Sequence, residues 1–230
     1  MGKLFDYVVV DGICRVKTFD DNILYIPVGG DWVREFWRCY YQVLIVDQYA
    51  GHRIQEGDIV FDCGAQIGMF SLLASKQGAK SVYAFEPYKP NVVCLEKLMR
   101  LDKQINVIPF AVGNFNGMSR FTINDESTGS GFVSDNGEHE VLVYRIDDVV
   151  SEFKIDKVNF IKMDVEGSEL SALEGAAETI HRNKPRLAIS AYHNEDDFRT
   201  IPNLIKSIRS DYEIKVVKVN NLCETVMIGE

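Results

Sequence analysis

The chain has 230 residues, of which 46% are hydrophobic and 26% charged, and its formal net charge is −9. Such a composition is ordinary for a globular protein, and the length fits one domain with a small extension. Because phosphate binding needs clustered lysine and arginine, the acidic balance without a basic block argues against a nucleic-acid partner. No apolar run reaches the roughly 18 residues of a membrane helix, so we expect no membrane partner and a cytoplasmic location.

The cysteines are five in number, widely spaced and without a CxxC pair. This pattern indicates free thiols in a reducing compartment, and it is not typical of a disulfide framework or a zinc site. They are Cys14, Cys39, Cys63, Cys94 and Cys223.

The first elements in chain order form an N-terminal extension, residues 1–55. Residues 7–28 predict a β-ribbon with turn chemistry at its Asp-Gly and Asp-Asp-Asn steps. Residues 31–50 predict a helix with Asp31 as its N-cap and an aromatic stripe on one face. The stripe is interpreted as core packing, and the alternative is a wall over a ligand pocket.

From residue 58 onwards, apolar strand patterns alternate with helical patterns, which predicts an α/β domain over 56–230. Strands are expected at 58–63, 81–86, 106–112, 158–165, 186–192, 212–219 and 224–229, and helices at 67–78, 90–102, 168–183 and 196–211. This alternation favours parallel strands with helices on both faces. The last two strands are joined by a short turn, so we expect an antiparallel hairpin at one edge.

One stretch, residues 113–150, interrupts the alternation. It contains two strand-like runs around a loop rich in serine, glycine, asparagine and aspartate, centred on 124–136. Long loops in compact domains often carry function, so this loop either shapes a ligand site or is a plain surface excursion.

The strand expected at 58–63 and the loop after it carry the sequence VFDCGAQIGMF over 60–70. A dinucleotide fingerprint GxGxxG would fall on Asp62, Gly64 and Ile67, of which only Gly64 matches, and no phosphate-binding P-loop is present. A carboxylate beside a close backbone turn favours a cationic nucleoside without phosphates, and S-adenosylmethionine is such a ligand. The alternative interpretation is that Asp62 only caps the following helix.

The next strand ends at Glu86, about twenty residues past the loop. At this separation an acid meets the ribose hydroxyls of an adenosine ligand, and one carboxylate accepts hydrogen bonds from both hydroxyls. Glu86 therefore strengthens the prediction of an adenosine-containing cofactor.

Taken in order, five motifs resemble those of the FkbM methyltransferases. They read VFDCGAQIGMFS, VYAFEPYKPN, VIPFAVGN, FIKMDVEGSELSALEGA and KPRLAISAYH, and the resemblance covers roughly residues 56–230. It implies a Rossmann-like class I fold, a seven-stranded mostly parallel sheet, S-adenosylmethionine as cofactor and a hydroxyl oxygen as methyl acceptor. The residues that we then expect to bind the cofactor are Asp62, Gly64, Ala65, Ile67, Gly68, Glu86, Pro87, Ala111 and Asp164.

The motif FIKMDVEGSE places charged residues at the end of a strand that should be buried. In a strand, Lys162, Asp164 and Glu166 share one face, and such groups are costly in a core unless they are paired or lie at its open carboxyl end. We assign site roles to Asp164 and Glu166, against the alternative that acids here only favour the following helix. Lys162 is either a structural counter-ion or a substrate contact.

Three residues are predicted to act in catalysis: Asp164, Glu166 and His193. An alcohol acceptor must lose its proton, and a histidine with an ordinary pKa near 6.5 suits that task. Either Asp164 or Glu166 is the competing base. No ligand spacing specifies a metal site, so none is assigned.

These observations predict a methyltransferase that acts on a hydroxyl of a sugar, a glycan or a small natural product. Two alternatives remain from the sequence: a catalytically inactive methyltransferase-like binding module, and a nicotinamide-dependent oxidoreductase on a similar sheet. The oligomeric state and the role of the N-terminal segment are left open.

Overall fold

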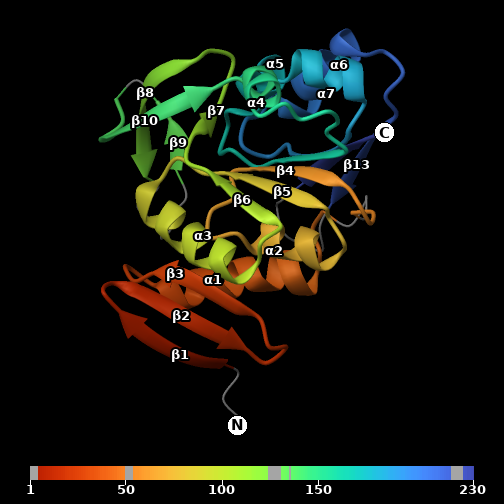
Figure 1. Ribbon diagram of the computed structural model, residues 1–230. Coiled ribbons are helices and arrows are strands. Elements are labelled where there is room, and N and C mark those ends of the chain that lie inside the picture. The colour runs from red at the N-terminus through yellow and green to blue at the C-terminus, as the bar shows by residue number, and fades with distance from the viewer. Residues whose placement is uncertain (1–4, 50–53, 124–130, 135, 219–224) are drawn as a thin grey trace.

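The structure is a computed structural model that describes residues 5–49, 54–123, 131–134, 136–218 and 225–230 (Figure 1). Most of the loop at 124–136 lies outside these residues, as does Cys223. The other four cysteines are free thiols, and all four are buried.

A seven-stranded sheet forms the centre of the molecule. Its strands are β4 (Ile59–Cys63), β5 (Ser81–Phe85), β6 (Ile105–Ile108), β11 (Phe160–Met163), β12 (Arg186–Ser190), β13 (Ile214–Lys218) and β14 (Thr225–Gly229). The order across the sheet is β13-β14-β12-β11-β4-β5-β6, and β14 runs antiparallel to both of its neighbours. The Rossmann-like, mostly parallel sheet with an antiparallel C-terminal hairpin is therefore confirmed.

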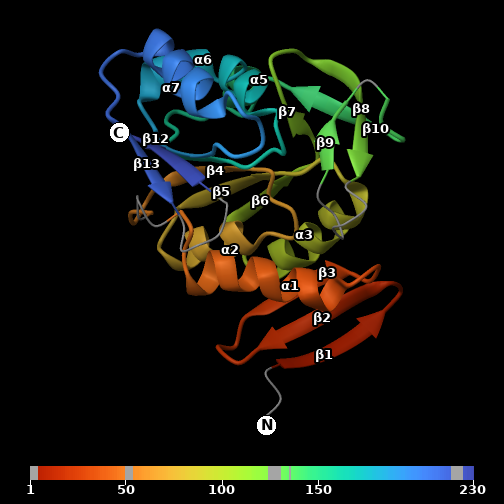
Figure 2. The same ribbon diagram turned by 180° about the vertical axis from the view of Figure 1, so that it is seen from behind.

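Helices cover both faces of this sheet (Figures 1 and 2). On one face lie α2 (Met69–Lys76) and α3 (Lys89–Leu101). The other face carries α4 (Ile146–Glu152), α5 (Glu169–Glu174), α6 (Ala177–Asn183) and α7 (Asp197–Ile208). With apolar helices on each side, the central strands are buried on both faces, which is why they read as nearly continuous apolar runs.

The helix expected over 168–183 is two helices, α5 and α6, separated at Gly175. A Cβ atom on Gly175 would lie 1.8 Å from the carbonyl oxygen of Gly113, so the chain breaks where two backbones touch. The pattern of apolar residues runs through this break, and it therefore does not reveal it.

Residues 5–49 begin with a three-stranded antiparallel sheet, β1 (Phe5–Val10), β2 (Ile13–Thr18) and β3 (Ile23–Pro27). The α-helix α1 (Trp32–Tyr40) follows, and Asp31 caps it by accepting a hydrogen bond from the Arg34 N–H at 3.2 Å. The helix expected to reach residue 50 instead continues as one π-helical turn, η1 (Tyr41–Ile45). Such a turn rotates the following side chains, and here it buries Gln42 and Val43.

The N-terminal sheet packs against the main domain from below in Figure 1. Its inward side chains share one apolar core with α1, α2 and α3. Those on β2 and β3 are Cys14, Val16, Leu24 and Ile26. The aromatic residues Phe36 and Tyr40 of α1 are buried in the same core, so this part of the stripe serves packing as expected.

A second, smaller sheet stands beside the main one. Its order is β7-β10-β8-β9, made of β7 (Ala111–Val112), β8 (Gly117–Ile123), β9 (Gly131–Val133) and β10 (His139–Tyr144). The strand expected over 106–112 is split between the two sheets at Pro109, which lacks the N–H that a continuing ladder needs. Within the described chain, no helix combines the length and apolar character of a membrane span.

Candidate functional site

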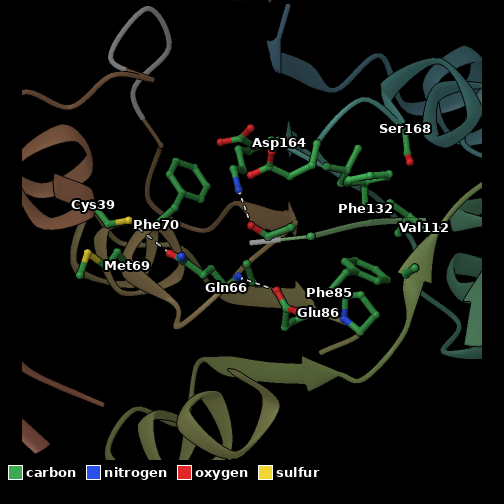
Figure 3. Close-up of a pocket in the computed structure, with 18 of the residues that line it drawn as sticks. Cys39, Gln66, Met69, Phe70, Phe85, Glu86, Val112, Phe132, Asp164 and Ser168 are labelled. Carbon is green, nitrogen blue, oxygen red and sulfur yellow. Dashed lines mark hydrogen bonds between the residues drawn. The ribbon is translucent and has the colours of Figure 1, made fainter. Parts of the chain in front are cut away.

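A cavity opens at the carboxyl ends of β4, β5 and β11, the edge at which ligands bind in open α/β sheets. Its empty volume is about 1020 Å³, a value that includes open solvent at the mouth. Three parts of the chain line it: the loops that follow the central strands, the segment formed by α1, η1 and residues 46–49, and the small sheet. Figure 3 shows Cys39 and Phe70 at one end in that view, Val112 at the other, and Gln66 and Glu86 between them.

The loop between β4 and α2 forms the floor of the cavity through Gly64, Ala65 and Gln66. Gly64 has φ +77°, and a Cβ there would lie 1.9 Å from the carbonyl oxygen of Asp164. Glycine is thus required because this loop touches the loop after β11. The Gln66 N–H donates to the Glu86 carboxylate at 2.9 Å, which ties the loop to the next strand.

Asp62 lies beneath this loop and is not among the residues that line the cavity, and its contact with the cofactor stays a prediction. Its side chain is fully buried, forms an ion pair with Lys162 at 3.0 Å and accepts from the Ser71 hydroxyl at 2.7 Å. The Lys162 ammonium also donates to the carbonyl oxygens of Cys63 and Gly64, at 3.3 and 2.8 Å. Asp62 and Lys162 therefore support the loop from below, which identifies Lys162 as a structural counter-ion.

Two other motif residues also lie away from the cavity lining. Ile67 is buried in the core that α1, α2 and α3 share. Gly68 starts α2 with φ +89°, and a Cβ there would lie 2.7 Å from side-chain atoms of Leu95 and Leu98 on α3. In the structure, Ile67 and Gly68 pack against helices, and their contacts with the cofactor stay predictions.

Glu86 lines the cavity at the end of β5, together with Pro87 and Ala111. Its carboxylate accepts hydrogen bonds from the backbone N–H groups of Gln66 and Tyr88, at 2.9 and 2.8 Å. Burial raises the pKa of Glu86 to about 8, well above that of an ordinary glutamate. A buried carboxylate of this kind gains from further donors, and vicinal hydroxyls of a ribose supply them.

Asp164 follows β11, which ends at Met163, and its carboxylate lines the cavity. The hydroxyls of Tyr49 and Tyr192 donate to its two oxygens, at 2.8 and 3.2 Å. Burial opposes ionisation, but the positive charges of Lys162 and His193 lower the pKa of Asp164 below its usual range. The cavity thus contains a carboxylate that stays ionised near neutral pH.

Glu166 also lines the cavity, but it is not part of a strand. Its φ of +53° turns the chain, so the expected alternation of one strand face stops before this residue. The Oε2 atom of Glu166 lies 3.6 Å from the Nε2 atom of His193. The two acids and the histidine predicted to act together are therefore neighbours.

His193 is held by Glu169, whose Oε1 atom lies 2.9 Å from Nδ1, while Asp164 Oδ1 lies 3.6 Å from Nε2. Burial favours the neutral ring, but the hydrogen bond to Glu169 and the surrounding carboxylates raise the pKa of His193 to about 9. The expectation of a base with a pKa near 6.5 is thus wrong for the protein without ligand. At neutral pH the ring is already protonated, because three acids surround it.

The same group is the one place among the described residues where ligand atoms gather closely enough to hold a metal ion. Atoms of Asp164, Glu169 and His193 lie within 4.8 Å of one another. In the structure, His193 is hydrogen-bonded to Glu169, so a cation would compete with the proton that the three carboxylates stabilise. We assigned no metal ligand from the sequence, and the absence of a metal site stays a prediction.

Sequence motifs missed the wall formed by α1, η1 and residues 46–49. Arg38, Gln42, Gln48 and Tyr49 line the cavity from this side. The side-chain oxygen of Gln48 is buried and has no hydrogen-bond partner among the described residues, so it is an acceptor available to a ligand. The signal available in the sequence was the aromatic helix, for which a pocket wall was the alternative interpretation.

The opposite wall is apolar and belongs mainly to the small sheet. Phe121, Phe132 and Val133 line the cavity there, near Phe110 and Val112. Of the loop expected to shape a ligand site, the described residues 131–133 do line the cavity, whereas 124–130 and 135 lie outside the described residues. An apolar wall opposite carboxylates suits a flat base at one end and a charged group at the other.

Comparisons with known proteins agree with this geometry. A family model described as the Methyltransferase FkbM domain matches residues 62–213. The 31-O-demethyl-FK506 methyltransferase FkbM of Streptomyces tacrolimicus is 29% identical, covering 80% of this chain and 79% of its own. Hexuronic acid methyltransferase AglP of Haloferax volcanii is 25% identical, covering 70% of this chain and 66% of its own.

Among solved structures, the chain is similar to the methyltransferase FkbM from Methylobacillus flagellatus. The TM-score is 0.65 at 30% identity, and the match covers 83% of this chain and 48% of that chain. The present chain therefore spans about half the length of that protein.

Proposed function

This chain belongs to the FkbM methyltransferase family and takes S-adenosylmethionine as its methyl donor, and we propose that its acceptor is a hydroxyl oxygen of a sugar, a glycan or a small natural product. The observation that carries the proposal is that Glu86, Asp164 and Glu166 line one cavity at the carboxyl edge of the sheet. The names of the two curated relatives support this acceptor class: one acts on a natural product and the other on a sugar acid. Family membership favours methyl transfer over the nicotinamide-dependent alternative.

The residues present fit this cofactor. Glu86 suits the ribose hydroxyls, and Pro87, Ala111 and the apolar wall around Val112 suit the adenine. The ionised Asp164 and the unpartnered oxygen of Gln48 suit positive groups. Bound in this way, S-adenosylmethionine supplies a methyl group on a positively charged sulfur.

The chain's own residues then align the acceptor and handle its proton. Methyl transfer is an in-line displacement, so the enzyme must hold the acceptor oxygen against the methyl carbon and keep water out. Asp164 is occupied by two tyrosine hydroxyls and keeps a low pKa, which makes it a site of negative charge rather than a base. We assign acceptance of the hydroxyl proton to Glu166, whose carboxylate lines the cavity and is 35% exposed.

His193 completes this group as a positively charged neighbour of Glu166. Its ring is fixed by Glu169, and its Nε2 atom faces both Asp164 and Glu166. A positive charge there offsets the repulsion between the carboxylates of Asp164 and Glu166 and orients them toward the cavity. This places His193 in a positioning role toward Glu166.

The test combines binding and turnover. We expect the wild-type protein to bind S-adenosylmethionine in calorimetry and to methylate a member of a panel of uronic acids, neutral sugars and polyol natural products. Glu166→Gln should lower turnover by about a hundredfold, the lower range for a lost general base, and leave cofactor affinity within about twofold. Binding without methylation of any acceptor in the panel would favour the inactive binding module, and equal loss of binding and turnover in Glu166→Gln would refute the base role.

A further inference from the structure

Two cations stand among the described residues that line the cavity, Arg38 and Lys162. The ammonium of Lys162 is engaged by Asp62 and by the carbonyl oxygens of Cys63 and Gly64, so it is committed to the floor. Arg38 differs, because its side chain is 45% exposed at the wall formed by α1. An anionic group entering the cavity therefore meets Arg38 first.

The guanidinium of Arg38 is held in a fixed orientation. Glu35 accepts from its Nε and Nη2 atoms, at 3.1 and 2.7 Å, and Gln42 accepts from Nη1 at 3.1 Å. Glu35 is buried, and although burial opposes ionisation, the hydrogen bonds and charge of Arg38 lower the pKa of Glu35. A guanidinium oriented in advance loses little side-chain entropy when it binds a carboxylate.

Gln48 lies beside this arrangement. Its backbone N–H donates to the carbonyl oxygen of Gln42 at 3.0 Å, which brings it next to the residue that contacts Arg38. Its side chain is only 7% exposed, lines the cavity, and keeps the unpartnered oxygen described above. A buried acceptor of this kind costs free energy until a donor reaches it.

The loop residue Gln66 shows how this group lies relative to the ribose site. Its side-chain amide is 3.3 Å from Glu35, and its backbone N–H donates to Glu86 at 2.9 Å. Glu35 and Glu86 thus contact opposite ends of one residue. In Figure 3, Cys39, the neighbour of Arg38 in the chain, lies across Gln66 from Glu86.

We propose that Arg38 and Gln48 form the subsite for the amino-acid end of the cofactor, with Arg38 binding its carboxylate and Gln48 accepting from its ammonium. The inference rests on the proposed function, since it takes S-adenosylmethionine as the ligand. With the ribose at Glu86 and the adenine toward Val112, the remaining end of the molecule points to α1. That end carries one negative and one positive group. The cavity presents there the exposed part of the Arg38 guanidinium, which is also bonded to Glu35 and Gln42, and the buried oxygen of Gln48.

The guanidinium of Arg38 could also bind a carboxylate from another source, a uronic acid acceptor. The experiment separates the two sources with three nucleoside ligands and one acceptor. S-adenosylhomocysteine carries both charged groups, its decarboxylated analogue keeps only the amine, and 5′-methylthioadenosine has neither. Glucuronate, present with saturating cofactor, reports on the acceptor.

Calorimetry is run on the wild type, Arg38→Met, Arg38→Lys, Gln48→Met and a control, Arg182→Met. Arg182 is 72% exposed on α6, where it pairs with Glu178, so its replacement should leave the affinity for all three nucleosides unchanged. Thermal unfolding of every variant shows that it is folded. Arg38→Lys keeps the positive charge and loses the planar guanidinium. Its affinity for S-adenosylhomocysteine should therefore lie between those of the wild type and Arg38→Met.

For Arg38→Met we expect affinity for S-adenosylhomocysteine to fall by about tenfold or more, with affinity for the other two nucleosides within about twofold. Gln48→Met should weaken both amine-bearing nucleosides and spare 5′-methylthioadenosine. Equal losses for all three nucleosides would show a structural role and overturn the inference. So would unchanged S-adenosylhomocysteine affinity with a raised KM for glucuronate, which would assign Arg38 to the acceptor. If the wild type binds none of the nucleosides, the proposed function fails first, and the inference with it.

Discussion

Two regions build the cavity, and they differ in how their residues come to face it. The strand-end loops within 62–213 carry Glu86, Asp164 and Glu166, each at the end of a central strand or shortly after it. The segment over 32–49 carries Arg38 and Tyr49 without any recognisable motif. Residues at strand ends face the cavity because the carboxyl ends of parallel strands meet at one edge of the sheet. Residues on a covering helix face it only if the helix packs in the right place and orientation.

The contact between Tyr49 and Asp164 joins the two regions across 115 positions of the chain. The ring of Tyr49 packs edge-on against Phe70 of α2, with centroids 5.2 Å apart. The covering segment is therefore attached at the chemical centre itself. A shift of the segment over 32–49 would therefore change the surroundings of the Asp164 carboxylate as well as the wall of the cavity.

The largest effect is expected in the loop region, at Gly64. Gly64→Ala adds a Cβ that would lie 1.9 Å from a backbone oxygen, in addition to the strain of φ +77°. We expect a loss of about 3 kcal/mol or more in the free energy of unfolding, measured by chemical denaturation. Gly57→Ala is the matched control, because Gly57 has φ +88° with nothing within 4 Å, and it should cost only about 1 kcal/mol. Similar losses in both variants would show that the touching loops do not constrain position 64.

An intermediate effect concerns pH and Glu86. With its pKa raised to about 8, Glu86 is largely protonated in the free protein near neutral pH, whereas ribose hydroxyls bind its ionised form best. Cofactor affinity should therefore rise as pH increases through 8, by about tenfold between pH 6.5 and 8.5, with proton release on binding at pH 7.

Calorimetry in buffers of different ionisation enthalpy measures this proton release. Glu86→Gln should bind weakly and lose the part of the pH dependence centred near 8, whereas any change near pH 9 that reports on His193 should remain. Cofactor affinity in the wild type that does not change between pH 6.5 and 8.5 would contradict the assignment of Glu86.

The smallest effect is expected from the link between the regions. Tyr49→Phe removes the 2.8 Å hydrogen bond to Asp164 and should weaken cofactor binding by about fivefold, near 1 kcal/mol. Tyr192→Phe, which removes a 3.2 Å bond from the motif region to the same carboxylate, should cost less. Binding titrations of both variants decide the order, and a larger loss in Tyr192→Phe would show that the covering segment is dispensable at Asp164.

The elements of the main sheet could be placed from the sequence because apolar runs and helical spacing are strong, local signals. The breaks at Pro109 and Gly175 are of two kinds. Proline itself indicates the end of a ladder, whereas Gly175 is explained only by its approach to the Gly113 backbone. The helix α4 escaped prediction because its seven residues are too few for a clear period.

In the site, Glu86 and Asp164 were predictable because strand ends converge in space whatever the surrounding sequence. The surroundings of Asp62 could not be predicted in this way. It stands at the end of a strand too, but its neighbour across the ladder is Lys162, and the ion pair turns its carboxylate into the core. Strand pairing between residues 100 positions apart cannot be read from the motif itself.

The amino-acid sequence by itself determined the class of fold, the strand-end acids and the type of cofactor, because each depends on short-range patterns or on a family's motifs. Only the tertiary structure decided which carboxylates face the cavity and which ones are neutralised in the core. It also decided the protonation of His193, because three acids from the loop after β11 and the start of α5 surround its ring. The electrostatic environment of a side chain depends on packing between segments that are far apart in the sequence. The same packing decides that wall residues such as Arg38 line the cavity, and local sequence patterns do not show it.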